Sequence, residues 1–323
     1  MSLILIIDEM HPSLLPLLTG IGVEADYCPQ LTAAEVPAAL AARPYSGLVV
    51  RSKLRITAAL LAQAPQLRFV ARAGAGVDNI DEDALAAAGV TLLNAPEGNR
   101  DAVGEFALGM LLDLLRSIAK GDREVRQGQW HREANRGEEL GPKTVGLLGY
   151  GHMGRALARR LSGFGCAVLA HDIDPNCQSD AFATCVPLAE LQARVEVLSL
   201  HIPYSAANHC FVNESFLGAF AHPFWLVNTA RGEVLDHAAL VATLQSGQVR
   251  GAALDVLENE KLGTLTPVQQ ATFDELRAAP NVVLTPHIGG WTQQSYQRIN
   301  EVLTAKIAAF LGLGQVGALR RAN

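Results

Sequence analysis

The fold is decided by the stretch Thr144-Val145-Gly146-Leu147-Leu148-Gly149-Tyr150-Gly151-His152-Met153-Gly154. An apolar run leads directly into glycines spaced G-x-G-x-x-G, and the residues that follow, Arg155 to Leu161, favour a helix. The first glycine permits a tight turn, the second lets a ligand approach the backbone, and the third lets the helix pack close to the strand. The stretch therefore predicts a strand–turn–helix unit whose helix N-terminus faces phosphate groups.

A second apolar run supports this interpretation. Residues 167–170 lead to Asp172, which stands 18 residues after Gly154. A carboxylate at this distance accepts the hydroxyls of a ribose and repels a 2′-phosphate, although Asp172 could also be a simple turn residue. We predict NAD rather than NADP as the cofactor, and its binding residues include Gly149, Gly151, His152, Met153, Gly154 and Asp172.

Short apolar runs alternate with Ala- and Leu-rich stretches along almost the whole chain. Several are apolar on both faces, which is typical of parallel strands between helices. The predicted strands are 3–7, 46–50, 68–71, 90–93, 144–148, 167–170, 196–200, 224–228, 250–254 and 282–285. The alternation predicts a doubly wound α/β fold. Because the glycine motif normally follows the first strand of its domain, the strands before it must form a separate domain.

Two stretches ahead of the glycine motif connect these domains. Residues 101–119 keep helical spacing of apolar side chains, with Asp101 as the expected N-cap. Residues 121–143 are polar, and Trp130 stands there among Arg126, Arg132 and Arg136. The second stretch is either a solvated loop or an arm that reaches another subunit.

Composition excludes several classes of protein. The 323 residues are 49% hydrophobic and 18% charged with a net charge of -6, so we expect two buried cores and no nucleic-acid or membrane partner. No apolar stretch approaches the roughly 20 residues that span a bilayer, and we expect the apolar start Leu3-Ile4-Leu5-Ile6-Ile7 to be a buried strand rather than a secretory signal. The five cysteines, at 28, 166, 177, 185 and 210, lack zinc-site spacing, so we expect no metal and a cytoplasmic location.

Charged and titratable residues follow three of the predicted strands. Ligands of open α/β sheets bind at the carboxyl ends of strands, where Arg231 and His287 stand. Arginine suits the capture of a carboxylate, and imidazole exchanges protons near neutral pH. A carboxylate beside His287 would raise its pKa, and spacing alone leaves both Glu258 and Glu260 open. Asp255 could instead face a nicotinamide amide. Taken singly, each residue could be structural.

Seven runs, spread in order along nearly the whole chain, resemble the D-isomer-specific 2-hydroxyacid dehydrogenase family. They are Arg72-Ala-Gly-Ala-Gly-Val-Asp-Asn-Ile-Asp81, Asn94-Ala-Pro-Glu-Gly-Asn99, the glycine turn, His201-Ile-Pro203, Asn228-Thr-Ala-Arg-Gly232, Leu254-Asp-Val256 and Thr285-Pro-His287. The resemblance implies that Arg231 holds the substrate carboxylate and carbonyl. It also implies that His287 is the acid/base and that Glu260, five residues past Asp255, is its partner.

The resemblance implies further binding residues and a domain plan. The cofactor would also contact His201, Pro203, Thr229, Ala230, Asp255 and Gly289. The substrate would contact Gly74, Ala75, Gly76 and Asn99. A flavodoxin-like substrate domain of residues 1–99 and 291–323 would carry an inserted Rossmann NAD-binding domain of residues 100–290. The active site would lie in the cleft between them, and the chain would form a homodimer.

The run Arg51-Ser52-Lys53-Leu54-Arg55 bears on the substrate. Three cations in five residues suit a phosphorylated acid, and the run resembles that of 3-phosphoglycerate dehydrogenases, where the first arginine faces the phosphate. Arg132 or Arg136 of a partner subunit could add a cation, or the run could be an exposed basic turn. We expect Arg51 and Ser52 to contact the substrate.

These residues predict an NAD-dependent oxidoreductase that interconverts 3-phosphoglycerate and 3-phosphohydroxypyruvate in serine biosynthesis. The alternatives are a glyoxylate/hydroxypyruvate reductase, another D-2-hydroxyacid dehydrogenase and, more remotely, an NAD-sensing binding protein that resembles corepressors of this fold. The intact set of Arg231, Glu260 and His287 argues against the last of these.

The chain departs from the family pattern after Glu260. A long stretch from Lys261 to Pro280 replaces a short loop and predicts a helix over 267–278, and Trp291 is a bulky residue after two glycines. The chain ends at Asn323, soon after an expected helix over 295–311, so we expect no C-terminal regulatory domain.

Overall fold

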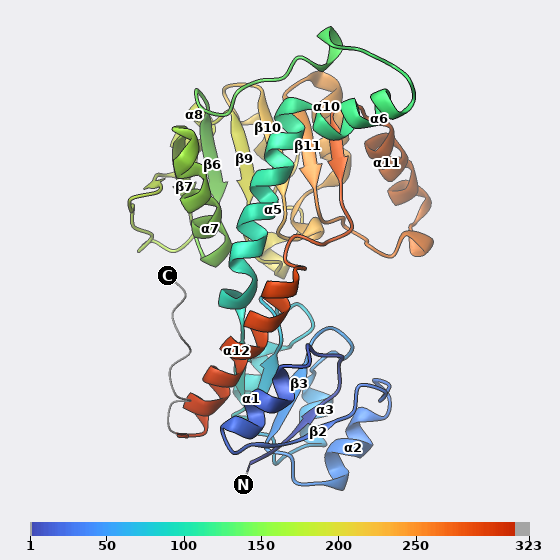
Figure 1. Cartoon of the computed structure of the whole chain (residues 1–323), viewed down its shortest axis with the longest axis vertical. Coiled ribbons are helices and arrows are strands. Elements are labelled where there is room, and N and C mark those ends of the chain that lie inside the picture. The colour runs from blue at the N-terminus through green and yellow to red at the C-terminus, as the bar shows by residue number, and fades with distance from the viewer. Residues whose placement is uncertain (1, 314–323) are drawn as a thin grey trace. The chain divides into compact units, whose positions relative to one another are not determined.

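The computed structural model describes residues 2–313, which form two compact units. One unit consists of Met1–Asn99 and the segment from Trp291 onward. Residues 314–323 of that segment lie outside the described part. The other unit is Arg100–Gly290. Each unit is a parallel sheet with helices on both faces (Figure 1), which confirms the predicted α/β class.

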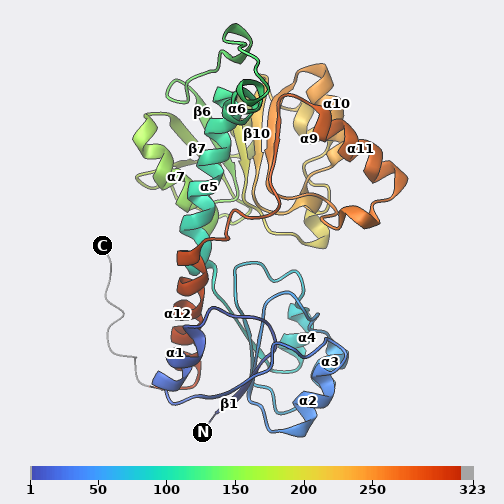
Figure 2. The ribbon, with the colours of Figure 1, turned by 45° about the vertical axis from the view of Figure 1, so that its right-hand side comes forward.

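The first unit has the strand order β2-β1-β3-β4-β5, and all its strands are parallel. This is the flavodoxin-like order. Its strands are β1 (Leu3–Ile6), β2 (Glu24–Tyr27), β3 (Gly47–Val50), β4 (Phe69–Arg72) and β5 (Thr91–Asn94). Figure 2 shows its helices on two sides of the sheet. One side holds α2 (Val36–Ala42), α3 (Ala58–Ala62) and α4 (Glu82–Ala87), and the other α1 (Leu14–Gly20) and α12 (Gln293–Phe310).

Side-chain alternation fills both faces of this sheet. Leu5 of β1 packs in the core under α2, α3 and α4, whereas Ile4 and Ile6 pack in the core under α1 and α12. Because both faces are buried, β1 and β3 are apolar at every position. The return helix α12 thus completes the core of the unit in which the chain begins.

The second unit has the strand order β12-β11-β10-β9-β6-β7-β8. Its strands are β6 (Thr144–Leu148), β7 (Ala167–His171), β8 (Thr184–Cys185), β9 (Val197–Leu200), β10 (Phe224–Asn228), β11 (Val249–Leu254) and β12 (Val282–Leu284). The direction of winding reverses between β6 and β9. Ligands of doubly wound sheets bind outside the carboxyl ends of the strands at such a point.

Helices cover both faces of the second sheet (Figures 1 and 2). On one face lie α5 (Pro96–Arg116) and α7 (His152–Leu161), and their apolar side chains share a core with β6 and β7. On the other lie α8 (Leu188–Arg194), α9 (Glu214–Gly218), α10 (His237–Ser246) and α11 (Pro267–Ala278). No helix of residues 2–313 is long and apolar enough to cross a membrane.

The sequence analysis did not predict two of the strands. Both β2 and β8 lie at sheet edges, where only one neighbour covers the strand. The residues of β2, Glu24-Ala-Asp-Tyr27, are exposed or half-buried, and β8 has two residues. An edge strand that faces water need not be apolar, so the search for apolar runs could not find them.

The predicted N-cap at Asp101 is wrong. Helix α5 begins at Pro96, and Asp101 lies inside it, where its carboxylate accepts a hydrogen bond from Arg160 of α7 at 3.1 Å. Proline is well suited to the first turn because its fixed φ is helical and its missing N–H has no intrahelical partner there. The apolar periodicity indicated the helix but not its start.

The stretch 121–143 combines a helix with irregular chain. Helix α6 (Ile118–Arg126) enters it, and a 3-10 turn follows at Glu133–Asn135. Trp130 is 80% exposed. The helices expected over 267–278 and 295–311 are confirmed as α11 and α12.

We predict opposite effects of alanine at two glycines of α5. A Cβ at Gly98 would lie 2.6 Å from the Cα of Ile299 in α12, whereas a Cβ at Gly109 meets nothing within 4 Å. Gly98→Ala should lower the free energy of unfolding by about 1–3 kcal/mol through overpacking. Gly109→Ala should change it little or raise it by up to about 1 kcal/mol, since alanine favours a helix. Urea unfolding of both variants measures the difference, and equal stabilities would contradict this packing.

Candidate functional site

The glycine turn between β6 and α7 packs closely on one side and is open on the other. Gly149 has φ +94°, and a Cβ there would lie 2.8 Å from the carbonyl of His201. A Cβ at Gly154 would lie 2.3 Å from the oxygen of Gly149, whereas one at Gly151 meets nothing within 4 Å. The N-terminus of α7, which starts with His152 and Met153, is therefore accessible to a phosphate.

Asp172 lies beside this turn, at the end of β7. One carboxylate oxygen accepts from the backbone N–H of Tyr150 at 2.6 Å, and the other accepts from the backbone N–H of Asp174 at 3.0 Å. The side chain of Ile173 is 95% exposed, so the surface next to the carboxylate is open and apolar. The N-terminus of α7 suits the phosphates of a dinucleotide, and the carboxylate of Asp172 suits its ribose. The apolar surface at Ile173 suits its base.

His201 follows β9, with Pro203 two residues further on. Its Nε2 pairs with the Ser199 hydroxyl at 2.9 Å, and burial lowers the pKa of the ring to about 4, so the ring is neutral. Its Nδ1 has no hydrogen-bond partner within the described chain. Neutral and close to Gly149, this histidine can bind a ligand but carries no charge.

A buried amide shapes the turn that holds Arg231. Asn228 ends β10 with no exposed surface; its Nδ2 donates to the carbonyl of Arg231 and its Oδ1 accepts from the N–H of Ala230, both at 3.0 Å. Thr229 is buried between them. The sequence prediction quoted Asn228 only as part of a motif. The available signal was an amide at the last position of a buried strand, where it can only bond locally.

Asp255 holds together the loop that carries His287. Its Oδ1 accepts from the Thr285 hydroxyl at 2.6 Å and from the N–H of Ile288 at 3.0 Å, and its Oδ2 accepts from the N–H of Gly289 at 2.7 Å. Its backbone oxygen accepts from the N–H of His287 at 2.8 Å. Asp255 is only 2% exposed. Asp255 thus positions His287. Its place near the cofactor stays a prediction.

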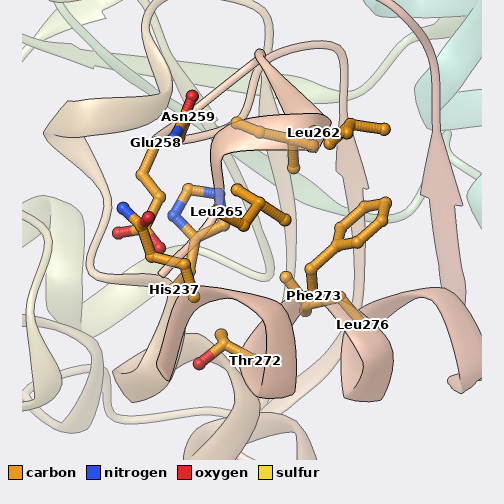
Figure 3. Close-up of a pocket in the computed structure, with 10 residues that line it drawn as sticks. His237, Glu258, Asn259, Leu262, Leu265, Thr272, Phe273 and Leu276 are labelled. Atoms are coloured by element: carbon orange, nitrogen blue, oxygen red, sulfur yellow. The ribbon is translucent and has the colours of Figure 1, made fainter. Parts of the chain in front are cut away.

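His287 pairs with Glu260 and not with Glu258. Its Nδ1 lies 2.7 Å from Oε1 of Glu260, and its backbone takes a left-handed φ of 55°. The hydrogen bond to Glu260 raises the pKa of His287 above its usual value, while burial of the ring and the charge of Arg231 act against this rise. Glu258 instead lines a separate pocket (Figure 3). Arg231, which can bind a carboxylate, and His287, which can donate a proton, therefore lie in the same unit.

The remaining predicted substrate residues lie in the first unit, and their roles stay predictions. Arg51 places its guanidinium 4.7 Å from the ring centre of Trp291 and 5.2 Å from that of Tyr296. Its Nη1 donates to the carbonyl of Glu9 at 3.4 Å, and Ser52 is exposed. The bulky Trp291 is thus explained as a cation–π partner of Arg51.

The glycine-rich loop after β4 contains the other predicted substrate contacts. Gly74 has a left-handed φ of 149°, and the Ala75 carbonyl accepts from Nδ2 of Asn94 at 2.9 Å. Gly76 and Asn99 are half-buried, and Oδ1 of Asn99 has no partner among residues 2–313. The contact of this loop with the substrate carboxylate stays a prediction.

The chain is similar to known proteins along most of its length. A family model described as "D-isomer specific 2-hydroxyacid dehydrogenase, NAD binding domain" matches residues 108–289. D-3-phosphoglycerate dehydrogenase of Rattus norvegicus is 33% identical over 305 residues, which are 94% of this chain and 55% of the rat protein. The chain thus spans about half the length of that relative.

Two further similarities cover more than four fifths of both chains. Hydroxypyruvate reductase of Thermotoga maritima is 35% identical over 266 residues, which are 82% of this chain and 85% of the reductase. A crystal structure of a glyoxylate reductase from Paecilomyes thermophila superposes with a TM-score of 0.83 at 26% identity and covers 95% of each chain.

We predict that Glu260→Gln lowers the pKa of His287. An amide carries no charge to stabilise imidazolium, so the ring should lose its proton at a lower pH. In the native chain, the stability that this pair adds is present below the ordinary imidazole pKa and is lost as the pH rises through the raised pKa. NMR titration of the histidine ring measures both values. Glu258→Gln is the matched control and should leave the titration unchanged; an unaltered titration in Glu260→Gln would refute the pairing.

Proposed function

Because the chain belongs to the D-isomer specific 2-hydroxyacid dehydrogenase family, we propose that it is an NAD-dependent oxidoreductase acting on a D-2-hydroxyacid or its 2-ketoacid. The observation that carries this proposal is the 2.7 Å pairing of His287 with Glu260, with the charge of Arg231 acting on the same ring. The three groups provide proton transfer and carboxylate capture in one place.

NAD, when bound, supplies or accepts the hydride, and the glycine turn with Asp172 is the part of the chain that would hold it. The planar guanidinium of Arg231 pairs with the substrate carboxylate and orients the neighbouring carbonyl. His287 in its protonated form donates a proton to the carbonyl oxygen during reduction, and in its neutral form takes the hydroxyl proton during oxidation. Glu260 favours the protonated form, and Asp255 holds the loop that carries His287.

For the substrate we propose the pair 3-phosphoglycerate and 3-phosphohydroxypyruvate, which would place the chain in serine biosynthesis in the cytoplasm as a homodimer. Arg51 and Ser52 would contact the phosphate. Stacking on Trp291 and Tyr296 engages the faces of the Arg51 guanidinium, while phosphate oxygens bind its edge. The likeness to a D-3-phosphoglycerate dehydrogenase over 94% of this chain supports this choice.

A second candidate is the reduction of unphosphorylated hydroxypyruvate or glyoxylate. One observation favours it: the Arg51 guanidinium already contacts two rings and donates to the carbonyl of Glu9, so part of its bonding capacity is used. The likeness to a hydroxypyruvate reductase, which covers 85% of that protein, also supports it.

We predict that His287→Ala lowers kcat for ketoacid reduction by about 10²–10⁴-fold, the usual contribution of a positioned acid/base. NAD affinity should change little, because the predicted cofactor residues are intact. Initial rates of NADH oxidation and cofactor titration measure the two effects. His209→Asn, at an exposed histidine of the same unit, is the control. Unaltered ketoacid reduction in His287→Ala would exclude this mechanism and favour a binding protein that senses NAD.

We predict that Arg51→Gln separates the two substrates. Loss of a charge-assisted hydrogen bond to phosphate costs about 1.5–3 kcal/mol, so kcat/KM for 3-phosphohydroxypyruvate should fall roughly 10- to 100-fold. The value for hydroxypyruvate should stay the same. Arg55→Gln, at an exposed position of the same basic run, is the matched control and should leave both unchanged. Equal kcat/KM of the unaltered protein on both ketoacids would refute a phosphorylated substrate.

A further inference from the structure

The cations of the basic run 51–55 differ in their surroundings. Lys53 uses its ammonium inside the first unit, where it donates to the backbone carbonyls of Ile7, Pro29 and Leu31. An ammonium has three donors, so these carbonyls occupy all of them. Lys53 therefore holds the loop in shape and has no donor left for a ligand. The cation that remains with defined contacts is Arg51.

The backbone of Arg51 is fixed at both its polar groups. Its N–H donates to Oδ2 of Asp8 at 2.7 Å, and Asp8 is only 7% exposed. Its carbonyl accepts from Nδ2 of Asn79 at 3.3 Å. A buried carboxylate is costly without donors, so the hydrogen bond to Asp8 is strongly favoured. The side chain of Arg51 therefore starts from a defined point.

Two aromatic rings contact the end of this side chain. The guanidinium carbon of Arg51 lies 4.7 Å from the ring centre of Trp291 and 5.2 Å from that of Tyr296, and the two ring centres are 5.0 Å apart. Since the three separations are nearly equal, the rings are neighbours and the guanidinium lies in the corner between them. The planar, weakly hydrated guanidinium suits such a cation–π contact.

Both rings are held by contacts of their own. Trp291 directly precedes Thr292, whose hydroxyl accepts from the N–H of Ser295 and whose N–H donates to Oγ of Ser295, each at 3.0 Å. This capping box fixes the start of α12 and with it the direction of the chain at Trp291. The hydroxyl of Tyr296 donates to the carbonyl of Glu9 at 3.0 Å. The corner between the rings is therefore ordered.

The guanidinium keeps most of its capacity for an anion. Arginine has five N–H donors, and the carbonyl of Glu9 accepts from one of them, Nη1, at 3.4 Å. The rings leave the positive charge in place, and no carboxylate within residues 2–313 forms an ion pair with Arg51. Free donors and an uncompensated charge suit the oxygens of a phosphate.

The order of the side chain favours one class of acid over another. A free arginine side chain loses much rotamer freedom when it binds a ligand, and the exposed Arg55 would incur this cost in full. Arg51 is already held by the rings, so an anion that binds it retains more of the interaction energy. A ketoacid without a second anionic group gains nothing from this order.

We propose that Trp291 and Tyr296 are positioning residues that set a preference for a 2-ketoacid with a second anionic group, because they hold the guanidinium of Arg51 in place for that group. The proposal rests on the function proposed above, in which Arg51 contacts a phosphate. The rings act through Arg51 and give the ligand no hydrogen bond of their own. The bulky residue after Gly289 and Gly290 thus has a functional reason.

The test follows the ratio of kcat/KM for 3-phosphohydroxypyruvate to kcat/KM for hydroxypyruvate. Trp291→Leu and Tyr296→Leu each remove one ring. A cation–π contact at an exposed site changes an equilibrium about two- to fivefold, so each variant should lower the ratio by about that factor. The fall should appear as a higher KM for the phosphorylated acid with kcat retained, since uniform binding is lost. Trp291→Phe keeps a ring and should restore most of the ratio.

A double-mutant cycle shows whether the effect passes through Arg51. In the Arg51→Gln background, Trp291→Leu should leave the ratio unchanged, because no cation remains to be positioned. Gln294→Leu, at an exposed residue of α12, is the matched control and should leave the ratio unchanged in both backgrounds.

The unaltered protein separates two kinds of failure. If it prefers the phosphorylated acid but Trp291→Leu keeps the ratio, or lowers it equally in both backgrounds, the positioning role is overturned and the proposed substrate is not. If its own ratio is close to one, the phosphorylated substrate is refuted and the preference set by the rings falls with it.

Discussion

The candidate site depends on one buried carboxylate. Asp255 receives three hydrogen bonds from Thr285, Ile288 and Gly289, and its backbone oxygen receives a fourth from His287. A buried carboxylate is costly unless such donors satisfy it, so the loop can only close in this way. The same closure holds His287 in a left-handed conformation that a histidine rarely adopts. Backbone strain at the proposed acid/base residue is thus maintained by its contacts with Asp255.

Three histidines show how surroundings divide one residue type into different roles. His201 and His237 are neutral because burial outweighs every favourable contact. The pKa of His287 is raised, because the hydrogen bond that its ring donates to Glu260 outweighs the burial of the ring. Only the last is suited to give up a proton near neutral pH. Each of the first two keeps one buried ring nitrogen without a hydrogen-bond partner among residues 2–313.

The proposed choice of substrate rests on the contacts of Arg51. The guanidinium of Arg51 contacts the rings of Trp291 and Tyr296 and donates to the carbonyl of Glu9. These contacts are compatible with a phosphate bound at the edge of the guanidinium and with the absence of one. Similar chains carry both kinds of name, a phosphoglycerate dehydrogenase and a hydroxypyruvate reductase. Similar chains are thus named for different acids, which is expected when function resides in sites carried by a common fold.

The elements that depend on local contacts could be predicted from the sequence alone. Buried strands such as β6 and β10 consist mainly of apolar residues, and Gly154 is required by a contact within one strand–turn–helix unit, where a Cβ would lie 2.3 Å from the oxygen of Gly149. Strands β2 and β8 and the true start of α5 were missed, because an edge strand need not be apolar and a helix start depends on its cap. Only the tertiary structure decided which groups meet. Glu258 and Glu260 stand two residues apart and are chemically identical, yet the fold turns Glu260 to His287 and Glu258 into a separate pocket. The direction in which each of these side chains points depends on packing between segments that are distant in the chain. The spacing of residues along the sequence therefore cannot predict it.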